Sequence, residues 1–133
     1  MQDNIEILVV DDSDLTVFLH TEIILLSELP YKVNTFLNGQ CAIEYLAEKS
    51  NEEKYFLVFL DINMPVMSGW EFLDEIPHLQ NAENVFISMV TSSVDESDKN
   101  RAKEYSNIIA FYEKPLDVED VIDSDYLLKR KIA

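Results

Sequence analysis

Short apolar runs alternate with longer amphipathic segments along the chain. The runs are rich in branched and aromatic residues, and they predict five strands at residues 5–10, 31–36, 55–60, 84–90 and 107–112. The segments that follow them have apolar residues at helical spacing or begin with capping and acidic residues. They predict helices within residues 14–29, 40–49, 70–79, 91–105 and 117–131.

This alternation predicts the fold class. Strands that are apolar throughout and separated by helices indicate a parallel sheet with helices on both faces. Right-handed crossovers and five strands favour an α/β, doubly wound, flavodoxin-like (βα)5 fold with strand order 2-1-3-4-5. The 133 residues have the length of one domain, so we expect a single domain over residues 1–133.

Some details of the helices can be predicted from single residues. Ser13 or Asp14 is a suitable N-cap for the first helix, and Pro77 is expected to bend or end the third. The first helix has apolar residues at helical spacing, namely Leu15, Phe18, Leu19, Ile23 and Leu26. The single cysteine, Cys41, lies beside Ala42 and Ile43 in the second helix and is expected to be a small core residue.

Polar residues follow four of the five predicted strands. They are Asp11 and Asp12, then Asp61, then Thr91, and finally Lys114 with Pro115. In a doubly wound sheet the carboxyl ends of the strands meet at one edge, so these side chains are expected to converge. A single acid or threonine after a strand is often only a helix cap, and a single lysine is often only solvated. Four such signals on one side of a sheet favour a site.

Three neighbouring carboxylates predict a bound cation. Their mutual repulsion is relieved by a hard divalent ion such as Mg²⁺ (or Mn²⁺), which prefers oxygen ligands. With the ion bound, Asp61 can attack phosphorus as a carboxylate nucleophile. Lys114 would then offset charge on the phosphoryl oxygens, and Thr91 could hydrogen-bond the transferred group.

Composition excludes several classes of partner. The net charge of -16 argues against direct binding to nucleic acid or to anionic membranes. No apolar stretch approaches the roughly 20 residues of a membrane helix, and the N-terminus lacks the features of a signal peptide. A cytoplasmic protein is therefore expected, and a lone cysteine suits a reducing compartment.

Four segments resemble a known family. They are VVDDSD at 9–14, FLDINMPVMSGWEFL at 59–73, MVTSS at 89–93 and FYEKPL at 111–116. In these segments the chain resembles a response-regulator receiver domain of two-component signalling, of the stand-alone single-domain type.

The resemblance implies a role for each matching residue. Asp61 would be the phosphoacceptor, and Asp11 and Asp12 would hold Mg²⁺ together with Asp61 and the backbone carbonyl of Asn63. Lys114 and Thr91 would contact the phosphoryl group. Thr91 and Phe111 would form the switch pair, and the peptide bond between Lys114 and Pro115 would be cis.

The resemblance also implies a function. A histidine kinase or histidine phosphotransfer protein would donate the phosphoryl group, and the domain would catalyse only its own phosphorylation and dephosphorylation. The output would be a protein contact through the fourth helix, fifth strand and fifth helix, or relay of the group, by a monomer or a phosphorylation-dependent dimer. The downstream partner is not specified.

Two other functions remain open at this point. A phosphatase of the haloacid-dehalogenase type also uses an aspartyl nucleophile, but it needs a second acid two residues later, where this chain has Asn63. A binding module with this fold could act without phosphorylation. The complete set of acids, threonine and lysine disfavours such a module.

Overall fold

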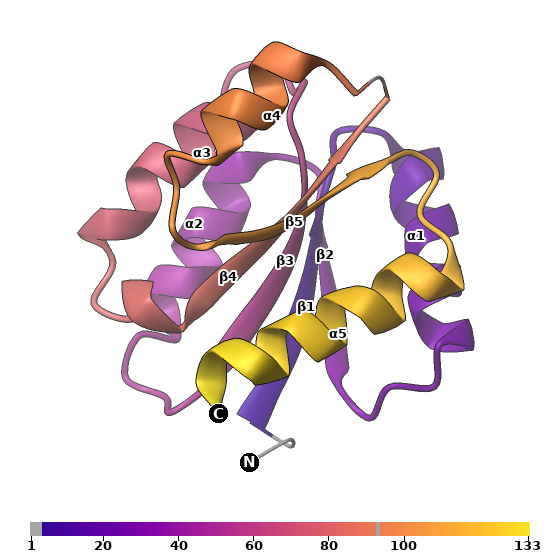
Figure 1. Ribbon diagram of the computed structural model, residues 1–133. Helices are drawn as coiled ribbons and strands as arrows, with labels where there is room; N and C mark the ends of the chain where they lie inside the picture. The colour runs from indigo at the N-terminus through magenta and orange to yellow at the C-terminus, as the bar shows by residue number, and fades with distance from the viewer. Residues whose placement is uncertain (1–3, 93) are drawn as a thin grey trace.

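A single parallel sheet forms the centre of the molecule (Figure 1). The computed structural model describes residues 4–92 and 94–133. Its strands are β1 (Ile5–Val10), β2 (Lys32–Phe36), β3 (Tyr55–Asp61), β4 (Val85–Thr91) and β5 (Ile108–Glu113). All pairings are parallel and the order is β2-β1-β3-β4-β5. The predicted doubly wound, flavodoxin-like fold and its strand order are confirmed.

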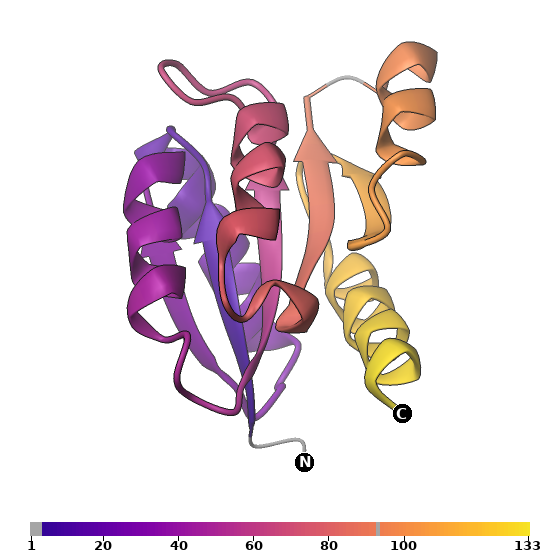
Figure 2. The ribbon, with the colours of Figure 1, turned by 90° about the vertical axis from the view of Figure 1, so that its left-hand side faces the viewer.

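Helices cover both faces of this sheet. They are α1 (Asp14–Leu26), α2 (Gly39–Glu48), α3 (Gly69–Glu75), α4 (Glu96–Ala102) and α5 (Val118–Ile132), with short 3-10 turns η2 (Ile76–His78) and η3 (Ala82–Asn84). In Figure 2, α2 and α3 lie in front of the sheet and α1 lies behind it. None of the helices in the described part of the chain is long and apolar enough to cross a bilayer.

The core consists of two layers, one on each face of the sheet. In β3, Phe56, Val58 and Leu60 pack toward α2 and α3, whereas Leu57 and Phe59 pack toward α1 and α5. Every residue of β1 is buried, which explains why the central strands have no polar face. Because both faces are covered, polar side chains of the central strands reach solvent mainly at the strand ends.

Capping residues define where the helices begin. Ser13 is the N-cap of α1, as one of the two predicted candidates, and Ser68 and Asp117 form capping boxes for α3 and α5. The first helix ends at Leu26, earlier than predicted, and Glu28 adopts a φ of 58° just beyond it. Pro77 ends the third helix, since the chain continues there as the 3-10 turn η2.

Two faces of helices differ from what the sequence suggests. The prediction that Cys41 is a core residue is wrong: its side chain is exposed, because Ala42 and Leu46 are the α2 residues that face the sheet.

The apolar spacing in α1 does not mark its buried face either. There the buried residues are His20 and Ile24, whereas Leu15 and Phe18 are exposed.

Candidate functional site

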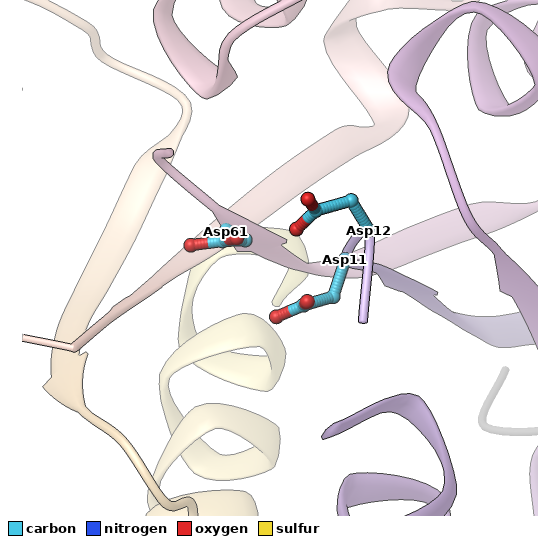
Figure 3. A group of neighbouring side chains, drawn as sticks. All are labelled: Asp11, Asp12 and Asp61. Atoms are coloured by element: carbon cyan, nitrogen blue, oxygen red, sulfur yellow. The ribbon is translucent and has the colours of Figure 1, made fainter. Parts of the chain in front are cut away.

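Three carboxylates gather at the carboxyl end of the two central strands. Asp11 and Asp12 follow β1, and Asp61 is the last residue of the adjacent strand β3 (Figure 3). One carboxylate oxygen from each residue lies within 4.8 Å of the other two. Asp11 and Asp61 are buried, whereas Asp12 is exposed. The convergence predicted from the strand ends is therefore present.

Backbone donors hold the two buried acids in place. The Ser13 N–H donates to Asp11 Oδ1 at 2.9 Å, and the Asn63 N–H donates to Asp61 Oδ1 at 3.3 Å. Both bonds span two residues, so each acid is fixed by the loop that directly follows it. A rigid strand end with a local hydrogen bond is a precise support for a reactive carboxylate.

Lys114 lies between the buried acids. Its Nζ is 2.7 Å from Asp11 Oδ2 and 3.3 Å from Asp61 Oδ1. Three carboxylates and one ammonium leave the cluster with an excess of negative charge. Oxygen ligands with this excess fit a hard divalent cation, so Asp11, Asp12 and Asp61 are suited to hold Mg²⁺.

The cluster changes the protonation of its members. Burial raises the pKa of Asp61 and the charge of Asp11 adds to this effect, although Lys114 and the Asn63 N–H oppose it. For Lys114, burial alone would lower the pKa. The hydrogen bond to Asp11 and the charges of Asp61 and Asp11 outweigh burial and raise the Lys114 pKa above its ordinary value. Lys114 therefore remains an ammonium.

Thr91 and Phe111 lie on the two strands beyond β3. Thr91 ends β4 one residue past Val90, which pairs with Asp61, and its side chain is buried. The Thr91 carbonyl accepts the Lys114 N–H at 2.7 Å. Phe111 is half-buried and packs on the layer beneath α2, α3 and α4, whereas Tyr112 packs on the opposite layer. The peptide bond between Lys114 and Pro115 is cis.

Other residues of the predicted set differ in how well they are placed. Asn63 lies in the loop after β3, two residues beyond Asp61, with its side chain exposed. Ser93, the last residue of the segment MVTSS, lies outside the described residues. Two features were not predicted. One is the exposed apolar face of α1 beside the acids, and the other is a hydrogen bond from Leu116 to His20.

Gly69 touches the backbone of the candidate nucleophile. Its N–H donates to the Ile62 carbonyl at 2.8 Å. A Cβ at this position would be 2.6 Å from the Asp61 carbonyl oxygen and 2.8 Å from Ile62 Cα. These are backbone atoms, so they cannot turn away as a flexible side chain could. The absence of a side chain at position 69 therefore lets α3 begin directly against Asp61.

Gly69→Ala is expected to lower the free energy of unfolding by about 1–3 kcal/mol, the usual range for a side chain forced into a packed interior. Urea unfolding measures this loss. Gly39→Ala is the matched control, because a Cβ there meets the flexible Met67 side chain, whose Sδ would be 2.8 Å away. Equal losses in the two variants would show that the Asp61 backbone yields as easily as a methionine side chain.

Comparison with known proteins identifies the family. Residues 7–124 match the family model described as the response regulator receiver domain. The chain belongs to this family. A two-component response regulator of Arabidopsis thaliana is 30% identical to this chain over 129 residues, and the match covers 91% of this chain and 82% of that protein.

Solved structures agree with this assignment. A response regulator receiver protein from Dyadobacter fermentans superimposes with a TM-score of 0.82 at 30% identity, covering 96% of this chain and 98% of that one. A two-component response regulator from Cytophaga hutchinsonii gives a TM-score of 0.88 at 26% identity, with the same coverage. The receiver spans only 15% of the length of another curated relative, a probable cyclic di-GMP phosphodiesterase of Vibrio cholerae.

Proposed function

We propose that this receiver domain accepts a phosphoryl group on Asp61 and acts as a response regulator. The observation that carries the proposal is the buried pair Asp11 and Asp61 with Lys114 between them. Asp11, Asp12, Asp61 and the backbone carbonyl of Asn63 would hold Mg²⁺. The protein would be cytoplasmic and would bind neither nucleic acid nor membrane.

The chemistry assigned to the site is phosphoryl transfer. A carboxylate oxygen of Asp61 forms a bond to phosphorus while the bond from phosphorus to the donor's histidine nitrogen breaks, and the departing imidazole takes up a proton. A bound Mg²⁺ supplies positive charge to the phosphoryl oxygens. Lys114, 3.3 Å from Asp61 Oδ1, would offset the remaining negative charge on these oxygens.

The response to phosphorylation would run through Thr91 and Phe111. Thr91 ends the strand next to β3, one residue past the partner of Asp61, and its hydroxyl would be drawn toward a phosphoryl group on Asp61. Phe111 pairs with Met89 two residues before Thr91 and is only half-buried, which leaves it able to move inward. The change would alter the surface of α4, β5 and α5, or the group would be relayed onward.

The phosphodonor would dock on the exposed face of α1. Three large side chains immediately after the acids are strongly exposed: Leu15 at 67%, Phe18 at 60% and Leu19 at 46%. An apolar face of this kind, next to a reactive site, is typical of a protein contact. It supports a histidine kinase or a histidine phosphotransfer protein as the donor.

Phe18→Ala is expected to slow phosphotransfer from such a donor about 5- to 30-fold, since truncation of a central aromatic side chain commonly costs about 1–2 kcal/mol of binding. Uptake from phosphoramidate should stay within about twofold of wild type, because small donors need no docking face. The matched control is Tyr126→Ala, which removes an equally exposed aromatic ring (57%) from α5. Equal slowing with both donors would contradict docking on α1.

The proposed function is tested on the wild-type protein. It is incubated with Mg²⁺ and either phosphoramidate or acetyl phosphate, and its intact mass is then measured. We expect one base-labile phosphoryl group per chain and none when the metal is chelated. Folded protein that acquires no phosphoryl group would overturn the proposal. Steady turnover of phosphate esters would instead indicate a phosphatase.

A further inference from the structure

His20 is a titratable side chain buried in the layer between α1 and the sheet. It is 3% exposed and lies on the inner face of α1 with Ile24. The Leu116 N–H donates to His20 Nε2 at 3.3 Å, and the two residues are separated by 96 positions in the sequence. Since Nε2 accepts this bond, the ring proton is carried by Nδ1. His20 therefore joins α1 to the segment between β5 and α5.

That segment carries Lys114. Pro115 has no N–H, so residues 114–116 contain two backbone donors. The Lys114 N–H donates to the Thr91 carbonyl at 2.7 Å, and the Leu116 N–H donates to His20. The segment is thus tied to β4 on one side and to α1 on the other, where the connection between β5 and α5 passes beside α1 (Figure 1).

We propose that His20 is a positioning residue for Lys114. By holding Leu116, it fixes the backbone from which the Lys114 ammonium reaches Asp11 at 2.7 Å and Asp61 at 3.3 Å. This inference rests on the proposed function, because it concerns the lysine assigned there to phosphoryl transfer. Without the bond, the Leu116 N–H loses the acceptor that joins it to α1, and the segment is free to shift toward another one.

The surroundings keep His20 in the form that accepts a hydrogen bond. Burial lowers its pKa, and the charge of Lys114 acts in the same direction, while the charge of Asp11 partly opposes them. The imidazole is therefore neutral at pH 7. A neutral ring beside Lys114 also adds no positive charge that would push the ammonium away from the acids.

Two amide substitutions separate the hydrogen bond from the polarity of the side chain. In His20→Gln the amide oxygen lies near the position of Nε2 and can accept from the Leu116 N–H. In His20→Asn the side chain is one methylene shorter, so its oxygen does not reach this N–H. We expect His20→Asn to slow phosphoryl uptake from phosphoramidate about tenfold and His20→Gln to stay within about threefold of wild type. Mg²⁺ binding, measured by calorimetry, should persist in both variants, because Asp11, Asp12 and Asp61 are retained.

A control and a spectroscopic readout complete the test. Ile24→Ala removes buried volume from the same face of α1 without removing a hydrogen bond, so it should lower stability but leave the uptake rate unchanged. The NMR resonances of the Leu116 amide and the Lys114 ammonium should shift in His20→Asn and return in His20→Gln. Wild-type uptake in folded His20→Asn, or no recovery in His20→Gln, would overturn the proposal. If wild type takes up no phosphoryl group, the proposed function fails, and these resonances alone decide whether His20 positions Lys114.

Discussion

Asp61→Asn is expected to abolish phosphoryl uptake from phosphoramidate and acetyl phosphate. The amide has nearly the same shape as the carboxylate, but its nitrogen is not a nucleophile and its oxygen carries no full charge. The substitution also removes one of the three carboxylates that lie within 4.8 Å of one another, so Mg²⁺ binding should weaken as well. Intact mass spectrometry after incubation with Mg²⁺ measures the loss.

The same variant has an expected effect on stability that separates it from simple misfolding. Burial and the neighbouring charge of Asp11 raise the pKa of Asp61, so ionised Asp61 destabilises the folded state when no cation is bound. A carboxyl whose pKa is raised in the folded state stabilises that state at low pH, and this contribution is lost as pH rises through the folded-state pKa. At pH 7 without metal, Asp61→Asn should therefore unfold at a higher urea concentration than wild type.

Asp14→Asn is the matched control. It makes the same chemical change at an exposed acid three residues after Asp11, where α1 begins. Its phosphoryl uptake should equal that of wild type. A phosphoryl group that still appears on Asp61→Asn, mapped by peptide sequencing to another residue, would show that Asp61 is not the acceptor.

Most of the fold was predictable because its signals are local. Each strand is a short apolar run, and the alternation with helices leaves few possible topologies. The candidate site follows from the same logic, since Asp11 and Asp61 stand directly after predicted strands and Lys114 stands two residues after one. The acids and the lysine meet because β1, β3, β4 and β5 are adjacent in the sheet.

The parts that could not be predicted depend on packing between distant segments. Both faces of α1 contain apolar residues, so helical spacing alone could not decide that Phe18 faces solvent and Ile24 faces the sheet. The prediction for Cys41 is wrong for a similar reason, because its apolar neighbours in the sequence do not show which face of α2 packs on the sheet. The bond between His20 and Leu116 joins positions that no local pattern connects, and a polar residue within an apolar helix was its only signal in the sequence.

Glu6 is the clearest example of a feature hidden by its local pattern. It lies in the apolar run IEILVV of β1, yet it is 1% exposed and carries a carboxylate. Three side chains from elsewhere satisfy it: the Tyr45 hydroxyl, the Asn34 amide at 2.6 Å and the Lys54 ammonium at 3.0 Å. A buried charge with this set of partners tolerates burial, and without them it would not.

Glu6→Ala is therefore expected to lower the free energy of unfolding by about 2–3 kcal/mol, because it removes the acceptor shared by the half-buried Tyr45, Asn34 and Lys54. Burial alone would raise the pKa of Glu6, but the bonds from Tyr45, Lys54 and Asn34 lower it below its ordinary value. A lowered pKa gives stability above the ordinary range of glutamate that is lost as pH falls through the folded value. Urea unfolding should show the full difference at pH 7 and a smaller one in acid.

Glu52→Ala is the matched control for Glu6→Ala, because it removes an exposed carboxylate that pairs with the same lysine, Lys54. Glu52 also pairs with Lys54, at 3.4 Å, but its side chain is 42% exposed, so its removal should cost less than about 1 kcal/mol. Glu6 lies near the amino end of β1, opposite the acids, so folded Glu6→Ala should still take up a phosphoryl group. If both variants lose the same free energy of unfolding, solvent replaces Glu6 as the hydrogen-bond partner of Lys54 and Tyr45 without a further loss. The buried carboxylate would then contribute no more than a surface ion pair does.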